Sequence, residues 1–369
     1  RSRGLGDVYK RQHLIKMLLT NILSQRGFPM QYLFHKKRTY FPILSLSVLF
    51  LLLLSGCGRQ QEYTQSGFYF DTVISLSVYD KDADHAKEVL DGALQLCETY
   101  DDLLNESKEG SDIYRINHAQ GDYTSVSSET VSLLYTALQY CAVSDGHLDI
   151  TIAPVKALWS FDPDSGNSYV PASSTIEQAL THVDYHMVEI DGNKVRLSDP
   201  DAGIDLGFIA KGYIADQLKA YLLSQHIDSG IINLGGNVLT IGQKPDGSAF
   251  TVGIQEPFAK QGKSITTVSA ADSKGDTFAS VVTTGIYERY FELNGEIYHH
   301  ILDAKTGYPI RNNLSSVTIL TDSSVQADAL STTCMILGLD DARELISSLN
   351  GEAQAIFITS DGEIIDTRN

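Results

Sequence analysis

The amino-acid sequence predicts a single domain of the α+β class. Helical and hairpin patterns follow one another in mixed order, without the regular strand–helix–strand repetition that builds a parallel sheet. Three pairs that close two-residue β-hairpins lie between alternating runs, at Asp191-Gly192, Asn294-Gly295 and Asp361-Gly362. No internal repeat or low-complexity linker divides residues 67–369, so we expect one compact domain there.

The elements are expected in the following order. Gly67–Tyr79 alternates polar and apolar residues as a strand does, and Asp84–Asn105 places its apolar residues on one helical face. Ile231–Ile241 is predicted to return as a further strand. The other helices are predicted at Ser128–Ser144, which Gly146 ends, at the capping box Ser174-x-x-Glu177, and at Lys211–Gln225, Ala327–Leu337 and Asp340–Leu349.

Composition and charge exclude several classes of protein. The 369 residues are 43% hydrophobic and 20% charged, which is typical of a globular chain and not of a disordered or coiled-coil one. Asp and Glu number 46 against 28 Lys and Arg, so the net charge of −18 has the wrong sign for binding nucleic acid through its phosphates. The four cysteines have no CxxC or zinc-ligand spacing.

The region before residue 58 is predicted to be a targeting segment. A basic stretch, Lys36-Lys37-Arg38, precedes the apolar run Phe41–Leu54, which is too short for a stable transmembrane helix. The run ends in Leu54-Ser55-Gly56-Cys57, which resembles the lipobox of bacterial lipoproteins. We therefore expect a signal peptide at 30–56, a lipidated Cys57 opening a polar tether over 57–66, and an extracytoplasmic protein anchored by lipid to the bacterial inner membrane. A plain signal peptide or an uncleaved anchor is the alternative.

Residues 1–29 are predicted to be a sequencing or assembly artefact. Ser2–Gln12 reads like a translated sequencing adapter, and Met30 would begin a signal peptide of ordinary length. Nine of the 28 basic residues but only one of the 46 acidic ones precede Cys57, so the mature chain carries a charge of about −26. Such a chain holds an anionic ligand only through a local device, such as a metal ion, a helix N-terminus or a placed lysine.

Five polar segments punctuated by glycine are the candidates for a functional site. Each also has a structural interpretation: a Gly-Gly pair is a turn, Asp205 is a helix N-cap, and one of His299 and His300 is a buried core histidine. In the functional interpretation, one of these histidines, near Asp303, exchanges a proton at a phosphoryl centre. The segments are Gly146–Pro154, Ile204–Tyr213, Asn233–Asn237, Tyr298–Pro309 and Ala327–Thr333.

Together the segments supply what a pyrophosphate site needs. Asp328 and Thr332 lie four residues apart on one helix face and offer the hard oxygen ligands that Mg²⁺ prefers. The structural alternative for this pair is a helix cap or a surface contact. Lys211 would add a point charge, and the Gly235-Gly236 turn would let the backbone approach a ligand closely.

In their order and composition, the segments resemble the ApbE family of FAD:protein FMN transferases, which are periplasmic or surface lipoproteins. The resemblance runs from about Phe68 to the C-terminus. It implies a T-fold-like α+β catalytic domain over 67–369, FAD as substrate and Mg²⁺ as cofactor. It also implies transfer of FMN through a phosphoester onto a threonine of an acceptor flavoprotein subunit in a membrane or extracytoplasmic redox system, with release of AMP.

The resemblance also implies roles for individual residues. It gives Asp328, Thr332 and the backbone oxygen of Phe208 as metal ligands. Asp303 or His300 would remove the proton of the acceptor hydroxyl, and the sequence does not choose between them. Contacts to the flavin nucleotide are expected at Phe70, His147, Leu148, Asp149, Asp205, Lys211, Gly235, Gly236, Thr284 and His300.

Two departures from the family pattern concern the balance between transfer and hydrolysis. Ser107 stands where many members carry a tyrosine that encloses the flavin, and Ile286 replaces the carboxylate of a Ser-Gly-Asp-Tyr segment. An FAD pyrophosphatase that uses Mg²⁺ and releases FMN and AMP is therefore one alternative, and a non-catalytic FAD-binding lipoprotein is another. The intact pair Asp328 and Thr332 argues against the second alternative.

Overall fold

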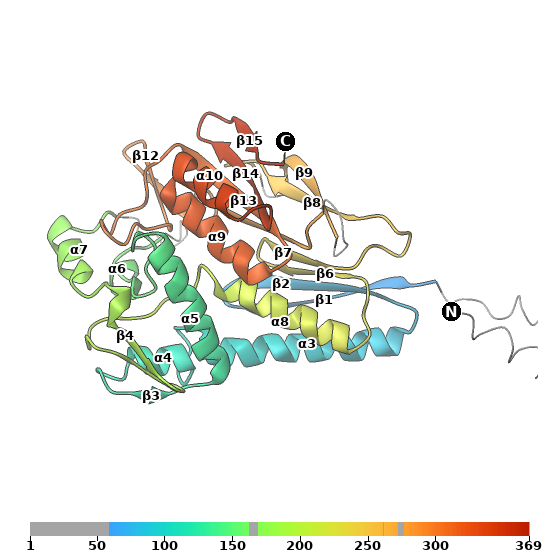
Figure 1. Cartoon of the computed structure of the whole chain (residues 1–369), viewed down its shortest axis with the longest axis horizontal. Helices are drawn as coiled ribbons and strands as arrows, with labels where there is room; N and C mark the ends of the chain where they lie inside the picture. The colour runs from blue at the N-terminus through green and yellow to red at the C-terminus, as the bar shows by residue number, and fades with distance from the viewer. Residues whose placement is uncertain (1–58, 162–168, 261, 272–276, 369) are drawn as a thin grey trace, which may run out of the picture. The chain divides into compact units, whose positions relative to one another are not determined.

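The computed structural model describes residues 59–161, 169–260, 262–271 and 277–368 (Figure 1). The predicted signal peptide, the lipobox and Cys57 lie outside these residues, so they stay predictions. Among the described residues, no helix combines the length and the apolar character needed to cross a membrane. Arg59–Asn369 form one compact unit, in agreement with the single predicted domain.

An eight-stranded sheet forms the centre of this unit. Its strand order is β1-β2-β6-β7-β10-β13-β14-β15, and every neighbouring pair is antiparallel, which confirms the α+β class. β13 is buried along its whole length, so both faces of the sheet are covered there. The strands are β1 (Gln61–Tyr69), β2 (Thr72–Asp80), β6 (Gly230–Leu234), β7 (Asn237–Ile241), β10 (Ser280–Gly285), β13 (Leu314–Thr321), β14 (Ala353–Thr359) and β15 (Ile364–Asp366).

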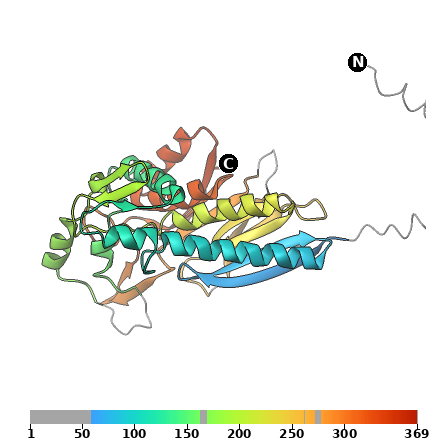
Figure 2. The ribbon, with the colours of Figure 1, turned by 90° about the horizontal axis from the view of Figure 1, so that it is seen from below.

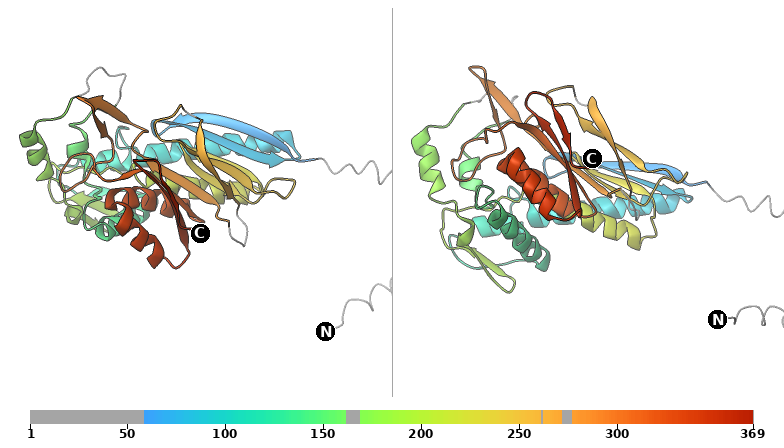
Figure 3. Two further views of the ribbon diagram at one scale, coloured as in Figure 1. Left: turned by 90° about the horizontal axis from the view of Figure 1, so that it is seen from above. Right: turned by 45° about the horizontal axis from the view of Figure 1, so that its top comes forward.

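Helices cover one face of the sheet, and a β-hairpin covers part of the other. α8 packs between α3 and α9, and the α3–α8 pair is seen side by side from below (Figure 2). Val282 and Val317 face the helices, whereas Val281 and Leu320 face the hairpin, because side chains alternate between the faces of a strand. Figure 3 gives two further views of the sheet with the helices and the hairpin. These elements are α3 (Ala83–Leu104), α8 (Ala210–Ser224), α9 (Ser324–Leu337), α10 (Leu339–Ser348), β8 (Phe250–Gln255) and β9 (Ser264–Ala270).

The remaining elements gather at one end of the sheet (Figure 1). Trp159 stacks on Phe161, and its indole N–H donates a hydrogen bond of 3.1 Å to the Gly307 carbonyl, so it links the stretch just after the first predicted segment to the fourth segment. The elements are α4 (Asp112–Asn117), β3 (Thr124–Ser125), α5 (Ser128–Val143), α6 (Ala153–Lys156), α7 (Ser173–Leu180), a 3₁₀ turn (Tyr185–Met187), β4 (Val188–Asp191), β5 (Lys194–Leu197), β11 (Tyr290–Leu293) and β12 (Glu296–His299).

Most predicted elements are confirmed. The three Xaa-Gly pairs close the β4–β5, β11–β12 and β14–β15 hairpins. The predicted helices correspond to α3, α5, α7, α8, α9 and α10, with ends that agree within three residues. α9 begins earliest relative to its prediction, because Ser323 caps it by accepting a hydrogen bond from the Gln326 N–H.

Two predicted single strands are wrong, because each is a hairpin. Gly67–Tyr79 turns at Phe70 and Asp71, which have φ of 52° and 55° and join β1 to β2. Ile231–Ile241 turns at Gly235-Gly236, with φ of 61° and 95°, and joins β6 to β7. A two-residue turn preserves the period-two alternation of side chains, so the pattern continues across it and hides the turn.

Two further predictions fail for local reasons. Most of the predicted tether, Gln61–Ser66, lies in β1 and pairs with β2 along its length. The capping box at Ser174 is also wrong: α7 already begins at Ser173, and Ala172 occupies the N-cap position without a side-chain hydrogen bond. The helix itself forms because Ile176 is buried against its neighbours.

Candidate active site

The first, second and fourth predicted segments are joined by hydrogen bonds. The Asp205 N–H donates to the Ile150 carbonyl at 2.7 Å, so the loop before α8 lies along the first segment. His147 Nδ1 lies 3.0 Å from Asp303 Oδ1, which links the first segment to the fourth. Residues that are 55 and 156 positions apart in the chain therefore contribute to one site.

The second and fifth segments meet where α8 crosses α9. The Gly212 N–H donates to Asp328 Oδ2 at 2.8 Å. A Cβ atom on Gly212 would lie 2.3 Å from the Ser324 carbonyl oxygen and 2.7 Å from Asp328 Cβ, so only glycine fits this crossing. The close approach sets Asp328 beside the first turn of α8, where Lys211 also lies.

Asp328 is a buried carboxylate whose charge has no ion-pair partner among the described residues. It is 4% exposed, and burial raises its pKa above the usual value near 3.8. The Lys211 charge, the Gly212 N–H and the Asn237 side chain oppose this rise but do not cancel it. A buried anion of this kind is costly unless a cation approaches it.

Hydroxyl groups stand next to this carboxylate. Thr332 lies one turn further along α9, and its Oγ1 is 3.1 Å from Thr284 Oγ1 on β10. Thr284 Oγ1 is also 2.8 Å from Ser331 Oγ. Phe208 is half-buried in the turn that leads into α8. A carboxylate, a hydroxyl and a backbone carbonyl are hard oxygen ligands, so this donor set fits the Mg²⁺ ion that the sequence predicts.

Asp205, on the other side of the start of α8, has a different environment. Its carboxylate accepts hydrogen bonds from the Gly207 N–H at 2.6 Å and from the Lys156 ammonium. Burial alone would raise its pKa, but Lys156, the Gly207 N–H and Lys211 together outweigh burial and hold the pKa below the usual value. Lys156 also contacts Glu106 Oε1 at 2.7 Å. The sequence contained no signal for this three-residue bridge, because its members come from three separate elements.

Two hairpin turns lie side by side at the same end of the sheet. Gly235 and Gly236 are exposed, and a Cβ atom on Gly235 would lie 2.2 Å from Thr72 Oγ1. The Phe70 N–H donates to Asp101 Oδ1 at 3.1 Å, which holds an aromatic residue at the uncommon φ of 52°. The backbone is therefore accessible at the Gly-Gly turn, as predicted, and constrained at the neighbouring one.

The three residues of the first segment that are predicted to contact the nucleotide differ in burial and in hydrogen bonding. His147 is half-buried and keeps its contact with Asp303. Leu148 is buried. Both oxygens of the buried Asp149 accept hydrogen bonds, Oδ1 from Thr151 and Oδ2 from the Tyr185 N–H. Asp149 therefore holds the loop in shape.

The two adjacent histidines have separate environments. His299 is buried, and its Nε2 lies 3.1 Å from the Ile310 carbonyl, so it is the core histidine of the pair. His300 is half-buried with its Nδ1 3.2 Å from the Arg289 carbonyl, and it feels the charge of Lys211. Burial lowers the pKa of His299 to about 4 and that of His300 to about 3, so both are neutral at pH 7.

The two positions that depart from the family pattern lie at different depths. Ser107 is exposed in the loop between α3 and α4. Ile286 is half-buried against the core beneath α9 and lines a cavity of about 250 Å³ together with His299 and Met335. Ile286 therefore has largely apolar neighbours there, and Arg311, which lines the same cavity, is paired with Glu296 at 2.8 Å.

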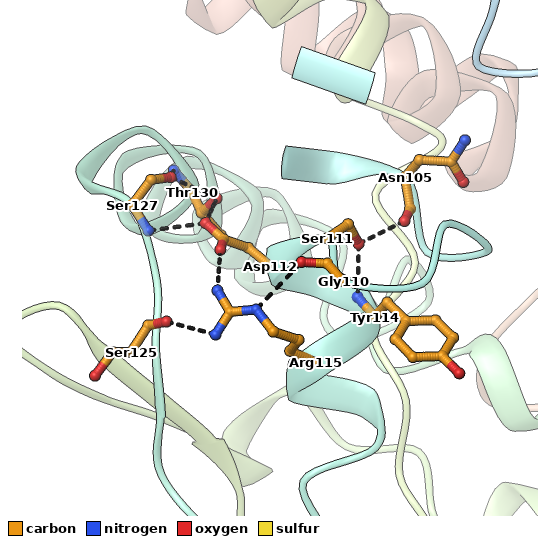
Figure 4. A network of polar contacts seen from close by, with 9 residues as sticks. All are labelled: Asn105, Gly110, Ser111, Asp112, Tyr114, Arg115, Ser125, Ser127 and Thr130. Atoms are coloured by element: carbon orange, nitrogen blue, oxygen red, sulfur yellow. Dashed lines mark hydrogen bonds and ion pairs between the residues drawn. The ribbon is translucent and has the colours of Figure 1, made fainter. Parts of the chain in front are cut away.

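A polar network next to the loop that carries Ser107 was not predicted. The buried Asp112 carboxylate accepts hydrogen bonds from the Ser127 N–H at 2.8 Å and the Thr130 hydroxyl at 2.7 Å, and it pairs with Arg115 (Figure 4). Its signal in the sequence was Ser111, an N-cap whose side chain accepts the Tyr114 N–H.

Hydrogen bonds of the same network hold both ends of the 105–110 loop, which carries Ser107. The Ser111 hydroxyl donates to the Asn105 carbonyl at 2.7 Å, and Arg115 Nε donates to the Gly110 carbonyl at 3.3 Å (Figure 4). Asn105 also donates to Asp101, the residue that holds the Phe70 turn. The loop over 105–110 is thus a fixed wall next to the predicted site.

Comparison with known proteins identifies the class to which this fold and site belong. Residues 70–357 match the ApbE family, so the chain belongs to the ApbE family, as the sequence predicted. A FAD:protein FMN transferase from Klebsiella pneumoniae (strain 342) is 35% identical over 306 residues, which are 82% of this chain and 91% of that relative. A FAD:protein FMN transferase from Vibrio cholerae serotype O1 is 29% identical and spans 85% of this chain and 92% of its own length.

Solved structures share the fold. The ApbE protein of Thermotoga maritima MSB8 superposes with a TM-score of 0.74 at 30% identity, over 83% of this chain and 97% of that one. The flavin transferase ApbE from Vibrio cholerae superposes with a TM-score of 0.70 at 25% identity, again over 83% and 97%. The predicted α+β domain of ApbE type is therefore confirmed.

Proposed function

We propose that this protein is a FAD:protein FMN transferase, which moves FMN from FAD to an acceptor protein. The observation that carries the proposal is the convergence of the predicted segments on Lys211 and Asp328, in a chain whose relatives bear that enzyme name. The acceptor is proposed to be a flavoprotein subunit of a membrane or extracytoplasmic redox system. FMN would be attached to a threonine hydroxyl through a phosphoester, and AMP would be released.

A Mg²⁺ ion is proposed to be held by Asp328, Thr332 and the backbone oxygen of Phe208. The buried charge of Asp328, without an ion-pair partner among the described residues, supports this assignment. When bound, the ion supplies charge neutralisation at the pyrophosphate and at the departing AMP. Thr284 would orient the Thr332 hydroxyl, to which its own hydroxyl is hydrogen-bonded.

The protein's own groups would bind and orient the nucleotide. Lys211 is a point charge within electrostatic reach of Asp205, Asp328 and His300, so it lies where a phosphate would be attracted. The exposed Gly235-Gly236 turn would let backbone N–H groups approach the nucleotide.

The proton of the acceptor hydroxyl is proposed to pass to Asp303. Burial lowers the pKa of His300 to about 3, which makes this imidazole a weak base at neutral pH. Asp303 is oriented by His147 at 3.0 Å and by the Lys305 N–H at 2.9 Å. His300 would instead stay neutral and orient a reacting oxygen.

Hydrolysis of FAD to FMN and AMP is the second candidate function. The exposed Ser107 favours it, because a small side chain at that wall leaves room for water to reach the phosphorus. A role in holding FAD without turnover is less favoured, because Asp328 and Thr332 are both in place.

Lipidation at Cys57 and anchoring to the outer face of the inner membrane are proposed from the lipobox alone.

The decisive experiment incubates the full chain in detergent with FAD, with and without Mg²⁺ and a threonine-bearing acceptor domain. Mass spectrometry follows the acceptor, and chromatography follows the free nucleotides. An acceptor heavier by one FMN, dependent on Mg²⁺, is the expected result. Free FMN and AMP with an unmodified acceptor would instead establish the hydrolase. No turnover of FAD under either condition would contradict both.

A further inference from the structure

We infer that Lys156 is a positioning residue of the nucleotide site, which holds the carboxylates of Glu106 and Asp205 together and thereby fixes two walls of the site. The inference rests on the proposed function, because it assumes that the site takes FAD. Nothing in the segment pattern of the sequence pointed to Lys156.

The geometry of the bridge is long-range. Lys156 ends α6, and its Nζ contacts Glu106 Oε1 at 2.7 Å and Asp205 Oδ2. Its two partners lie 50 and 49 residues away in the chain, one in the loop after α3 and one in the loop before α8. A single ammonium group therefore joins the side chains of three elements, in addition to the backbone hydrogen bonds from Asp205 to Ile150 and from Ala153 to Gly203 that hold α6 beside the loop before α8.

The exposure of the three side chains places the bridge at a surface that a ligand can reach. The Lys156 side chain is 44% exposed, whereas those of Glu106 and Asp205 are mostly buried. A half-exposed pair contributes little to folding, because water screens it. Its value lies in the arrangement that it imposes on the two more buried carboxylates.

The surrounding charges show what Lys156 prevents. Glu106 is mostly buried and faces the negative charges of Asp205 and Asp71, and these effects raise its pKa. Lys211 acts on Asp205 from the other side. Without Lys156, three carboxylates would repel one another at the mouth of a site that must admit an anionic nucleotide.

The wall that carries Glu106 cannot relieve this repulsion by moving. Ser111 and Arg115 hold the two ends of the 105–110 loop, as described above (Figure 4). The Asp205 carboxylate would turn away instead, because hydrogen bonds from Asp205 to Ile150 and between Ile204 and Asn117 hold the backbone of its loop. Loss of Lys156 should therefore weaken nucleotide binding while it leaves the chemical groups in place.

The test measures the dissociation constant of FAD for the full chain in detergent with Mg²⁺, by quenching of flavin fluorescence, together with the thermal midpoint. The variants are Lys156→Met, Lys156→Arg and the double variant Lys156→Met/Glu106→Gln. We expect about a tenfold weaker Kd for Lys156→Met, a Kd within about twofold of wild type for Lys156→Arg, and recovery to within about threefold for the double variant. The rate at saturating FAD should change little.

The matched control is Lys263→Met, which removes an exposed ion pair with Glu256 at 2.5 Å on the β8–β9 hairpin. It should leave the Kd unchanged. A wild-type Kd in Lys156→Met would overturn the inference, and so would a double variant that binds as weakly as the single one, because the loss would then not come from the unbalanced carboxylate. A wild-type chain that binds no FAD would overturn the proposed function itself, and this role with it.

Discussion

Two carboxylates flank the start of α8 and differ in how their charge is balanced. Asp205 contacts Lys156, and this lysine, the Gly207 N–H and Lys211 together hold its pKa below the usual value in spite of burial. Asp328 is buried on the opposite side with no ion-pair partner among the described residues, and burial raises its pKa. Lys211 lies within electrostatic reach of both.

The difference separates a structural charge from a functional one. The charge of Asp205 is balanced within the chain, so it serves to hold loops together, and its pKa stays below the usual value. Asp328 costs the metal-free fold free energy, because a buried charge is retained without an internal partner. A buried carboxylate without an internal partner is expected where a bound cation balances its charge. The metal assignment therefore depends on the contrast between Asp328 and Asp205.

Among the tests of the contrast between Asp205 and Asp328, the largest effect is expected for the turnover of Asp328→Asn. Asparagine keeps an acceptor for the Gly212 N–H but removes the charge. We expect metal-dependent turnover to fall by about a thousandfold, as for the loss of a main electrostatic stabiliser. The thermal midpoint of the metal-free protein should stay the same or rise, because an unbalanced buried charge is removed.

The measurements are the initial rate of FMN release or transfer, a calorimetric titration with Mg²⁺ and thermal denaturation in chelator. Asp322→Asn, a change at the end of β13 outside the proposed metal site, is the control. Retained turnover in Asp328→Asn would remove the metal assignment. A lower midpoint in chelator would show that Asp328 is balanced internally after all.

The helix crossing that sets Asp328 in place can be tested by Gly212→Ala. The added Cβ would lie 2.3 Å from the Ser324 carbonyl, so α8 and α9 must separate. We expect a loss of about 2 kcal/mol in the free energy of unfolding and a weaker response to Mg²⁺. Urea denaturation measures the first and a Mg²⁺ titration the second.

Leu223→Ala, at an exposed position of the same helix, controls for changes in α8 and should be nearly neutral. If Gly212→Ala left both stability and the Mg²⁺ response unchanged, the close crossing would not be what positions the carboxylate.

The fold was predictable from the sequence where local signals and tertiary packing agree. Turn residues at Asp191-Gly192 and Asn294-Gly295 fixed their hairpins, and Gly146 follows the end of α5 as expected. The hairpin at Phe70 was missed because a large aromatic residue rarely adopts positive φ, and it does so here only because the Asp101 carboxylate binds its N–H. That contact spans 31 residues and leaves no local trace.

The site was predictable in its segments but not in its bridges. Asp328 and Thr332 were proposed from their spacing on one helix, and Lys211 from its place at the start of the neighbouring helix α8. The role of Lys156 was not predicted, because a lysine that pairs with two carboxylates about 50 residues away leaves no pattern in the sequence. Asp149 is predicted to contact the nucleotide, and the folded loop shows in addition that its carboxylate accepts hydrogen bonds from Thr151 and Tyr185, which the sequence does not indicate.

Asp205→Asn tests the other carboxylate of the pair, the one that has an ion-pair partner within the chain. Here the change removes a carboxylate that Lys156 balances, so the free energy of unfolding should fall by about 1 kcal/mol, a modest amount because Lys156 is half-exposed. Its effect on the metal-free midpoint is thus opposite in sign to that of Asp328→Asn. Parallel thermal scans of the two variants in chelator provide the measurement, and shifts of the same sign would contradict the distinction between the two carboxylates.

The smallest expected effect concerns how the free energy of unfolding changes as the pH is lowered. The usual histidine pKa is near 6.5, whereas burial lowers that of His299 to about 4 and that of His300 to about 3 in the folded chain. Between about pH 6.5 and pH 4 the unfolded chain therefore binds more protons than the folded one, so stability should fall as the pH is lowered through that range.

Asp328 works in the opposite direction, because its raised pKa lets the folded chain take up a proton before the unfolded one does. Urea denaturation in chelator at several pH values should give a steeper loss for Asp328→Asn and a shallower one for His300→Asn. His186→Asn, whose side chain is 71% exposed, should follow wild type. If all three variants kept the wild-type slope, neither the buried histidines nor the buried carboxylate would retain the charge states assigned to them, and the contrast between Asp205 and Asp328 would lose its electrostatic basis.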